Sequence, residues 1–304
     1  MEIIDIDRLM SLRPAGIRSR LEPGDELLPL APPTLLPALR APLLDVPGAW
    51  GGWVQSVMVG ASRADAPLCV SLDAEGGAER GGPRGLHEGV GALLDHARRA
   101  RFRRPLVIHA RLGTVDAHDQ DSVDLARLRV LEAVDAGATS VQLGAFGEPD
   151  DAAALLRELL LPAADTGMGI VVQLLDGEQA PTVGRELPAA FHVDAWTGPA
   201  PASLSPRRDM LREDSLVGPL PAWIDATVLL GKVIRAVAAT DAELQTAAGL
   251  LGLWGRKDDP RHERLDAMLS METEELFTRL KARGSAGHAM VELSKEEPPP
   301  PFGE

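Results

Sequence analysis

Short apolar runs alternate with longer amphipathic segments along the middle of the chain. From about residue 40, each run closes at a glycine or a polar residue, and a segment with apolar residues three or four positions apart follows it. Continuous apolar runs of this kind are typical of parallel strands buried on both faces. The pattern therefore predicts repeated strand–helix units joined by right-handed crossovers.

The runs predict the positions of the elements. Strands are expected at residues 41–48, 66–74, 104–113, 138–147, 168–177 and 189–198, and a further strand is a candidate within 215–231. Helices are expected at residues 49–62, 86–102, 122–137 and 148–167. In the third of these helices, the period-3.6 apolar spacing is carried by Leu125, Leu128, Leu131 and Val134.

Two architectures share this element order, a closed (β/α) barrel and an open doubly wound sheet. The glycine-rich segment 75–85, EGGAERGGPRG, is too long and too charged for a dinucleotide or phosphate-binding fingerprint. Even spacing without a phosphate loop favours an α/β fold of the (β/α) TIM type, incomplete or divergent because only six strands are convincing.

The regions outside the repeats complete the predicted domain organisation. Residues 1–39 form a proline-rich lead-in packed on the body, and residues 40–221 form the barrel body. Residues 222–290 form a helical C-terminal region, and residues 291–304 form a disordered tail. The leucine-rich helical region is expected to bury apolar surface against the barrel or against a second subunit in a homo-oligomer.

Charge and composition narrow the classes of partner. The formal net charge of −14 opposes binding to nucleic acid or to an anionic membrane. No apolar run approaches the roughly 18 residues of a membrane span, and the acidic N-terminus is unlike a secretory signal, so a cytoplasmic location is expected. Cys69 lies in an apolar run and is expected to be buried, and no lysine precedes Lys232, so the six convincing strands offer no Schiff-base lysine.

In a barrel, the working residues lie at the carboxyl ends of the strands. This rule selects His109 and Asp194 as candidate catalytic residues. It selects as candidate substrate-binding residues Asp73, Arg111, Gln142, Gln173, Asp176 and Trp196. His109 and His192 are weak candidates for metal ligands, since no HxH or HExxH spacing occurs. For both histidines the structural alternative is a satisfied core side chain.

Arg111 is the candidate anion anchor because a guanidinium binds carboxylate or phosphate through two parallel hydrogen bonds. Positions i and i+2 share one face of a strand, so we expect His109 and Arg111 to face the interior together. The aspartates of the following segment, VDAHDQD, are expected to cap the next helix.

The order of these segments resembles the class II (zinc-type) ketose-bisphosphate aldolases and the tagatose-bisphosphate aldolase accessory subunits. The resemblance covers residues 40–196 and rests on PLVIHARLG and EAVDAGATSVQLGAF. It implies a TIM barrel, aldol cleavage and a divalent metal, zinc, bound through a His-x-Asp-His-Gly motif. His109 and Gly113 match that motif, whereas Arg111 and Leu112 replace its aspartate and second histidine, and Gln173 replaces a glutamate.

Two functions follow as hypotheses. The first is a divergent aldolase-like barrel of carbohydrate metabolism that binds a small anionic metabolite such as a sugar phosphate, as a lyase or as a sugar isomerase. The second is a catalytically silent barrel, a pseudoenzyme that serves as a subunit or scaffold protein.

Overall fold

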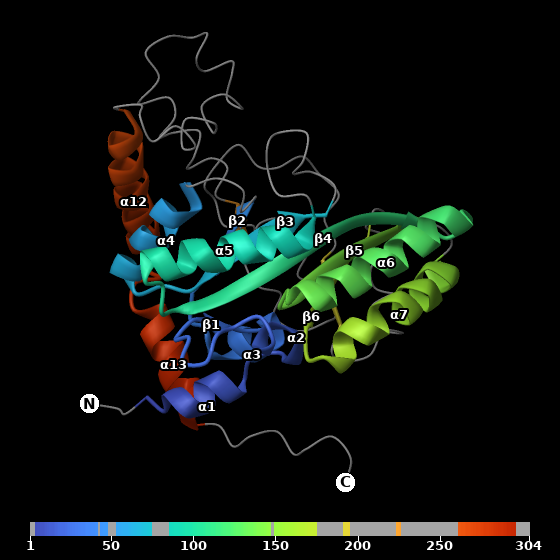
Figure 1. The fold of residues 1–304 in the computed structure, drawn as a ribbon, viewed down its shortest axis with the longest axis horizontal. Coiled ribbons are helices and arrows are strands. Elements are labelled where there is room, and N and C mark those ends of the chain that lie inside the picture. Colours follow the sequence, from blue (N-terminus) through green and yellow to red (C-terminus); the bar gives the residue numbers. More distant parts are fainter. Residues whose placement is uncertain are drawn as a thin grey trace.

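A parallel sheet forms the centre of the molecule (Figure 1). The computed structural model describes residues 4–41, 43–47, 53–74, 85–146, 149–174, 191–194, 223–225 and 261–295. The strands are β1 (Leu28–Pro29), β2 (Leu43–Pro47), β3 (Leu68–Asp73), β4 (Pro105–Asp116), β5 (Ser140–Phe146), β6 (Gly169–Leu174), β7 (Phe191–Asp194) and β8 (Trp223–Asp225). Five of the six expected runs contain a strand, the run 104–113 coincides with the first part of β4, and β8 lies inside the candidate segment 215–231.

The strand order identifies the architecture as a TIM-type barrel. In the described part of the chain the order is β7-β6-β5-β4-β3-β2-β8, and every pairing is parallel. Successive strands are therefore neighbours, and the last strand pairs with β2, the first strand of this series. Within the described residues no pairing joins β7 to β8, so the series of strands is not closed into a complete barrel there.

The four helices that follow strands β2 to β5 cover the outer face of the sheet (Figure 1). They are α4 (Trp53–Ala64), α5 (Leu86–Ala100), α6 (Gln120–Ala136) and α7 (Pro149–Asp165). Asp119 caps α6 by accepting a hydrogen bond from the backbone of Asp121, as its sequence predicts. Gly137, with φ 85°, ends the same helix in the left-handed conformation that glycine tolerates best.

The apolar face of α6 is not the one that the sequence pattern indicates. Leu125, Leu128 and Leu131 are 47%, 64% and 48% exposed. The helix instead buries its smaller side chains, which are Val123, Ala126, Val130, Ala133 and Ala136. Small residues bring the helix close to the sheet, and this close packing turns the leucines outward.

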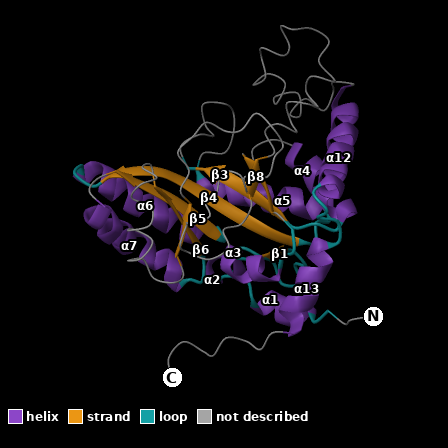
Figure 2. Cartoon of the chain, turned by 180° about the vertical axis from the view of Figure 1, so that it is seen from behind, coloured by secondary structure: helices purple, strands orange, loops and turns teal. Residues whose placement is uncertain are grey.

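The face of the sheet opposite α4–α7, which we call the inner face, is covered at its amino end by the N-terminal segment (Figure 2). This segment contains α1 (Ile6–Ser11), α2 (Ala15–Arg18), α3 (Pro32–Leu35) and the 3-10 helix η1 (Leu36–Ala38). A Cβ on Gly169 would lie 2.6 Å from the Pro32 ring, so the proline-rich segment packs directly on the start of β6. The expected packing of this segment on the body is confirmed.

Two helices from the end of the chain pack on the barrel. Helix α12 (Arg261–Arg279) lies beside α4, where Ser56 donates a 2.6 Å hydrogen bond to Asp266. Helix α13 (Ser285–Lys295) packs beside α1 at the amino end of the inner face, where Arg8 of α1 donates a hydrogen bond to the Leu293 carbonyl. The residues of 261–295 therefore bury apolar surface against their own barrel. A homo-oligomer through this region stays a prediction, and Leu250, Leu251, Leu253 and Trp254 lie outside the described residues.

Two expected boundaries need correction. The strand β8 lies beyond residue 221, where the barrel body was expected to end, inside the segment 215–231 that was a candidate for a further strand, and it pairs with β2. Helix α13 continues past residue 291, where the tail was expected to begin, because Leu293 is buried in the core. The remaining residues of the tail lie outside the described part.

None of the helices described is both long enough and apolar enough to span a membrane.

Candidate functional site

The strand β4 carries two kinds of side chain on its two faces. Leu106, Ile108 and Ala110 are buried in the core between the sheet and its outer helices. Val107 lies on the other face, the inner face, where it is buried among apolar side chains of the N-terminal segment. His109 and Arg111 follow it at alternate positions on the same face. The expected orientation of His109 and Arg111, away from the outer helices, is confirmed.

The inner face changes from apolar to polar along the strands. Its amino end is filled by Leu43, Cys69 and Val107 together with Leu residues of the N-terminal segment. Toward the carboxyl ends, side chains of β2, β3, β4 and β5 form a set of hydrogen bonds that we call the polar cluster. Its members are Asp45, Ser71, His109, Arg111, Ser140 and Gln142.

Asp45 and Arg111 form a short ion pair in the cluster. The Asp45 residue is 1% exposed. Its Oδ2 atom accepts a 2.6 Å hydrogen bond from Arg111 Nη2, and its Oδ1 atom accepts a 2.5 Å bond from the Ser71 hydroxyl. The Arg111 side chain is 31% exposed. The carboxylate is therefore held inside the barrel, while the guanidinium reaches toward the surface.

His109 lies beside this pair, between Ser140 and Gln142. Its Nε2 lies 3.0 Å from Gln142 Oε1, and an amide oxygen only accepts hydrogen bonds, so Nε2 carries the hydrogen and donates it. In the neutral ring Nδ1 then accepts from the Ser140 hydroxyl at 3.0 Å. Burial lowers the pKa of His109 to about 4, although the Asp45 carboxylate opposes the shift. The ring is therefore neutral at physiological pH.

The strand register places several predicted residues at one level of the sheet. Asp73 pairs with Arg111, Arg111 with Gln142, Gln142 with Val171, and Val171 with His192. Gln173 and Asp194 pair with each other two residues further toward the carboxyl ends of their strands. Register thus brings together the positions that the sequence selects from five strands. The side chains of Gln173, His192 and Asp194, and all of Asp176 and Trp196, lie outside the described residues.

Three members of the cluster are missing from the sequence-based selection. Asp45, Ser71 and Ser140 lie inside apolar strand runs, ahead of the strand ends to which the barrel rule points. A signal for them does exist, because a carboxylate or hydroxyl within a buried run requires a partner on a neighbouring strand. Asp45, the acidic residue within the first run, was the most informative of them.

Past the cluster, β4 extends further than its sequence indicates. The register shifts between Arg111 and Thr114, and Gly113 adopts φ 87° within this irregularity. The strand then continues to Asp116, whose carboxylate accepts from the backbone of His118. The aspartates of this segment serve as local caps, as the sequence predicts.

The described donor set does not fit a zinc ion. Both ring nitrogens of His109 are engaged in hydrogen bonds, and both oxygens of Asp45 accept from other cluster members. The Arg111 guanidinium would also repel a second cation in the same cluster. Within the residues that the structure describes, no three His, Cys, Asp or Glu side chains form a group that could hold a metal ion.

Cys69 belongs to the apolar part of the inner face. It is fully buried, and this burial raises the pKa of its thiol well above the usual range, with a further rise from the Asp45 carboxylate. The side chain is therefore a neutral core residue, as expected, and not a thiolate nucleophile.

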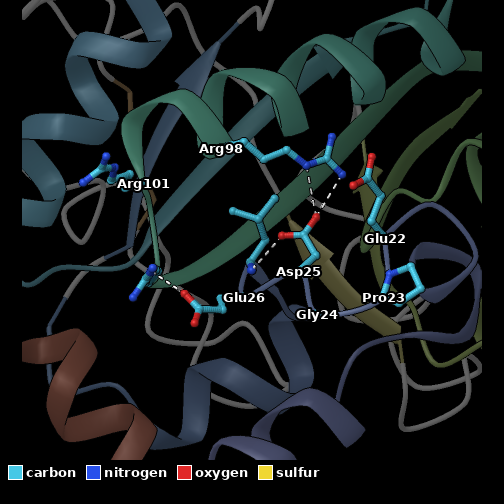
Figure 3. A pocket seen from close by; sticks show the side chains of 9 residues that line it. Glu22, Pro23, Gly24, Asp25, Glu26, Arg98 and Arg101 are labelled. Atoms are coloured by element: carbon cyan, nitrogen blue, oxygen red, sulfur yellow. Dashed lines mark hydrogen bonds and ion pairs between the residues drawn. The ribbon is translucent and has the colours of Figure 1, made fainter.

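A second polar region lies near the amino end of β4 and the C-terminus of α5 (Figure 3). It is a pocket of about 340 Å³ between residues 22–27 and three arginines, Arg98, Arg101 and Arg103. Arg98 pairs with Asp25 at 2.9 Å, and Arg103 pairs with Glu26 at 2.6 Å. These pairs join the N-terminal segment to α5 and to the loop that follows it, and we assign them a structural role.

Comparison with known proteins yields similarity at the level of solved structures. Neither a protein-family model nor a curated protein matches the sequence. The structure is similar to that of the YdjI aldolase from Escherichia coli K12, with a TM-score of 0.49 and 13% identity over 84% of this chain and 96% of that chain. It is also similar to fructose-bisphosphate aldolase from Campylobacter jejuni, with a TM-score of 0.49 and 13% identity over 83% of this chain and 93% of that chain.

Proposed function

We propose that this chain binds a small anionic metabolite, such as a sugar phosphate, at the carboxyl end of its barrel. The supporting observation is Arg111, whose partly exposed guanidinium is held 2.6 Å from the buried Asp45 carboxylate at the end where barrel enzymes work. A planar guanidinium in a fixed orientation suits phosphate or carboxylate recognition. Asp73 on β3 and Gln142 on β5 are the register partners of Arg111 on its two neighbouring strands, and they would contact the uncharged part of the ligand.

As to chemistry, we propose an aldolase-like lyase or a sugar isomerase in which His109 has a positioning role. Its ring is buried and neutral, and it donates to Gln142, so it would orient that amide against the ligand. A base with a pKa near 4 would abstract a proton inefficiently at neutral pH. A catalytic role for Asp194 remains part of this proposal.

The buried, neutral ring of His109 also favours a second candidate, a catalytically silent barrel that binds the metabolite without converting it. The two candidates differ in whether the protein labilises a proton next to the ligand carbonyl. Proton NMR of fructose 1,6-bisphosphate or dihydroxyacetone phosphate in D₂O would report this exchange. Enzyme-dependent loss of the α-proton signal supports the lyase or isomerase, and an unchanged spectrum at saturating protein supports the silent barrel.

Calorimetric titration with fructose 1,6-bisphosphate, fructose and inorganic phosphate tests the binding itself. We expect the bisphosphate to bind and fructose not to, and Arg111→Met to weaken binding by about 10- to 100-fold, as loss of a charged hydrogen bond does. Arg101→Met is the matched control, since it removes an exposed arginine at the other end of the barrel. Binding that survives Arg111→Met but is lost in Arg101→Met would refute the proposal.

A further inference from the structure

The positive charge in the polar cluster belongs to a side chain that the barrel itself holds in place. We infer that Arg111, oriented by Asp45, is the cation that recognises the anionic ligand, and that this recognition needs no divalent metal. The inference rests on the proposed function and deepens it. It names the source of the charge and gives Asp45 a positioning role.

The evidence for positioning is the way in which Asp45 is held. Its carboxylate lies on β2, accepts from Ser71 on the neighbouring strand β3, and accepts from Arg111 on β4. Both oxygens are thus engaged, and burial prevents water from competing for them. A guanidinium held by Asp45 in this manner keeps its planar group in one orientation. The arginine side chain therefore loses less conformational entropy when a ligand binds to it.

The evidence against a metal lies in the same set of donors. A zinc ligand must present a lone pair, and the one lone pair of neutral His109 accepts from Ser140, while Nε2–H donates to Gln142. Zinc binding by His109 would therefore break one of these bonds inside a buried site.

The first experiment asks about metal and uses the full chain with zinc chloride as the probe. We expect calorimetry to show the same zinc binding, if any is seen, for the wild type and for His109→Asn. We also expect EDTA treatment to change the Kd for fructose 1,6-bisphosphate by less than about twofold. A one-to-one zinc site that disappears in His109→Asn, or bisphosphate binding that appears only with zinc, would overturn the inference.

The second experiment asks whether Asp45 acts through Arg111. Asp45→Asn keeps an oxygen for Ser71 and removes the charge, and we expect it to raise the bisphosphate Kd about 10-fold or more. In the Arg111→Met background the same change should have almost no further effect, which a merely structural role would not produce. Ser71→Ala, which leaves the ion pair in place, should alter the Kd by less than about threefold.

The remaining outcomes are also decisive. If Asp45→Asn does not fold, Arg111→Lys replaces it, because lysine keeps the charge without the planar fork, and it should weaken binding less than Arg111→Met. Equal losses from Asp45→Asn in the wild-type and Arg111→Met backgrounds would show that Asp45 does not act through Arg111. If no bisphosphate binds with or without zinc, the proposed function fails and this inference falls with it, whereas zinc-dependent binding refutes the inference alone.

Discussion

Polar side chains on the inner face of the barrel form two small hydrogen-bonded groups. Asp45, Ser71 and Arg111 form one group, and His109, Ser140 and Gln142 form the other. The hydrogen bonds within both groups join residues of neighbouring or next-nearest strands. Loss of one partner would leave a buried polar group unsatisfied, which costs free energy of folding.

The titration of His109 gives a prediction at this scale. Its pKa is about 4 in the folded chain, against about 6.5 in an unfolded chain. As the pH falls below about 6.5, the imidazole of His109 is protonated in the unfolded state, whereas in the folded state it stays neutral until about pH 4. The contribution of the neutral ring is thus complete above pH 6.5 and is lost as the pH falls to 4, in total roughly 3 kcal/mol.

Urea unfolding between about pH 7 and about pH 4.5 measures this loss. His109→Gln should lose less stability over that interval than the wild type, because glutamine does not titrate. His118→Gln, which changes an exposed histidine, is the control and should follow the wild type. Parallel curves for the wild type and His109→Gln would show that the buried ring is not responsible.

The helices pack on the barrel through small residues, and this is the main feature at the scale of the elements. Helix α6 meets the sheet through alanines and valines, and α4 meets α12 at Gly60. A Cβ at Gly60 would lie 2.4 Å from the Ser270 carbonyl oxygen and 2.7 Å from Thr273 Cβ. The contact of α12 with the barrel therefore depends on the absence of a side chain at that position.

Two glycine-to-alanine changes test this packing. Gly60→Ala should destabilise the fold by about 1–3 kcal/mol, because α12 must move away from α4. Gly91→Ala is the matched change inside α5, where nothing lies within 4 Å of the new Cβ, and it should stabilise the fold by about 0.5–1 kcal/mol. Thermal or urea unfolding measures both. A neutral effect of Gly60→Ala would contradict the described packing of α12.

The whole molecule has two distinct ends. At the amino end of the barrel, Leu9, Leu35 and Leu43 form a core with Met290 and Leu293 of α13, so segments from both ends of the sequence close the same face. At the carboxyl end, the polar cluster occupies the inner face. The apolar core and the polar cluster are thus separated along the barrel axis, and the ligand site that we propose lies on the side of the polar cluster.

Removal of α13 tests the role of the amino-end core. Met290 and Leu293 each contribute about 1.5–3 kcal/mol through burial, a large part of a typical total of about 5–15 kcal/mol. A chain that lacks residues 285–304 should therefore precipitate or bind a hydrophobic dye, as judged by sedimentation and fluorescence. The control, which lacks only residues 296–304, should stay folded and monodisperse. Equal behaviour of the two truncated chains would refute the proposed role of α13.

Much of the fold was predictable from local pattern. The six strand runs, the helix caps at Asp119 and Gly137 and the barrel class all follow from apolar spacing and turn chemistry, which act within a few residues. The strand Trp223–Asp225 lay inside a candidate segment, but its place beside β2 did not follow from its sequence. A three-residue strand has too little pattern of its own, and its pairing partner decides its conformation.

The sequence by itself determined that His109 and Arg111, two positions apart in one strand, share a face, whereas the end of that strand, at Asp116, lies beyond the end that its apolar run indicates. The tertiary structure decided that Arg111 meets Asp45, that Ser140 and Gln142 engage His109, and that the leucines of α6 face outward. These outcomes depend on strand register and on how closely each helix approaches the sheet. Both are set by contacts between residues that are far apart in the chain, and a periodic pattern carries no information about such distances.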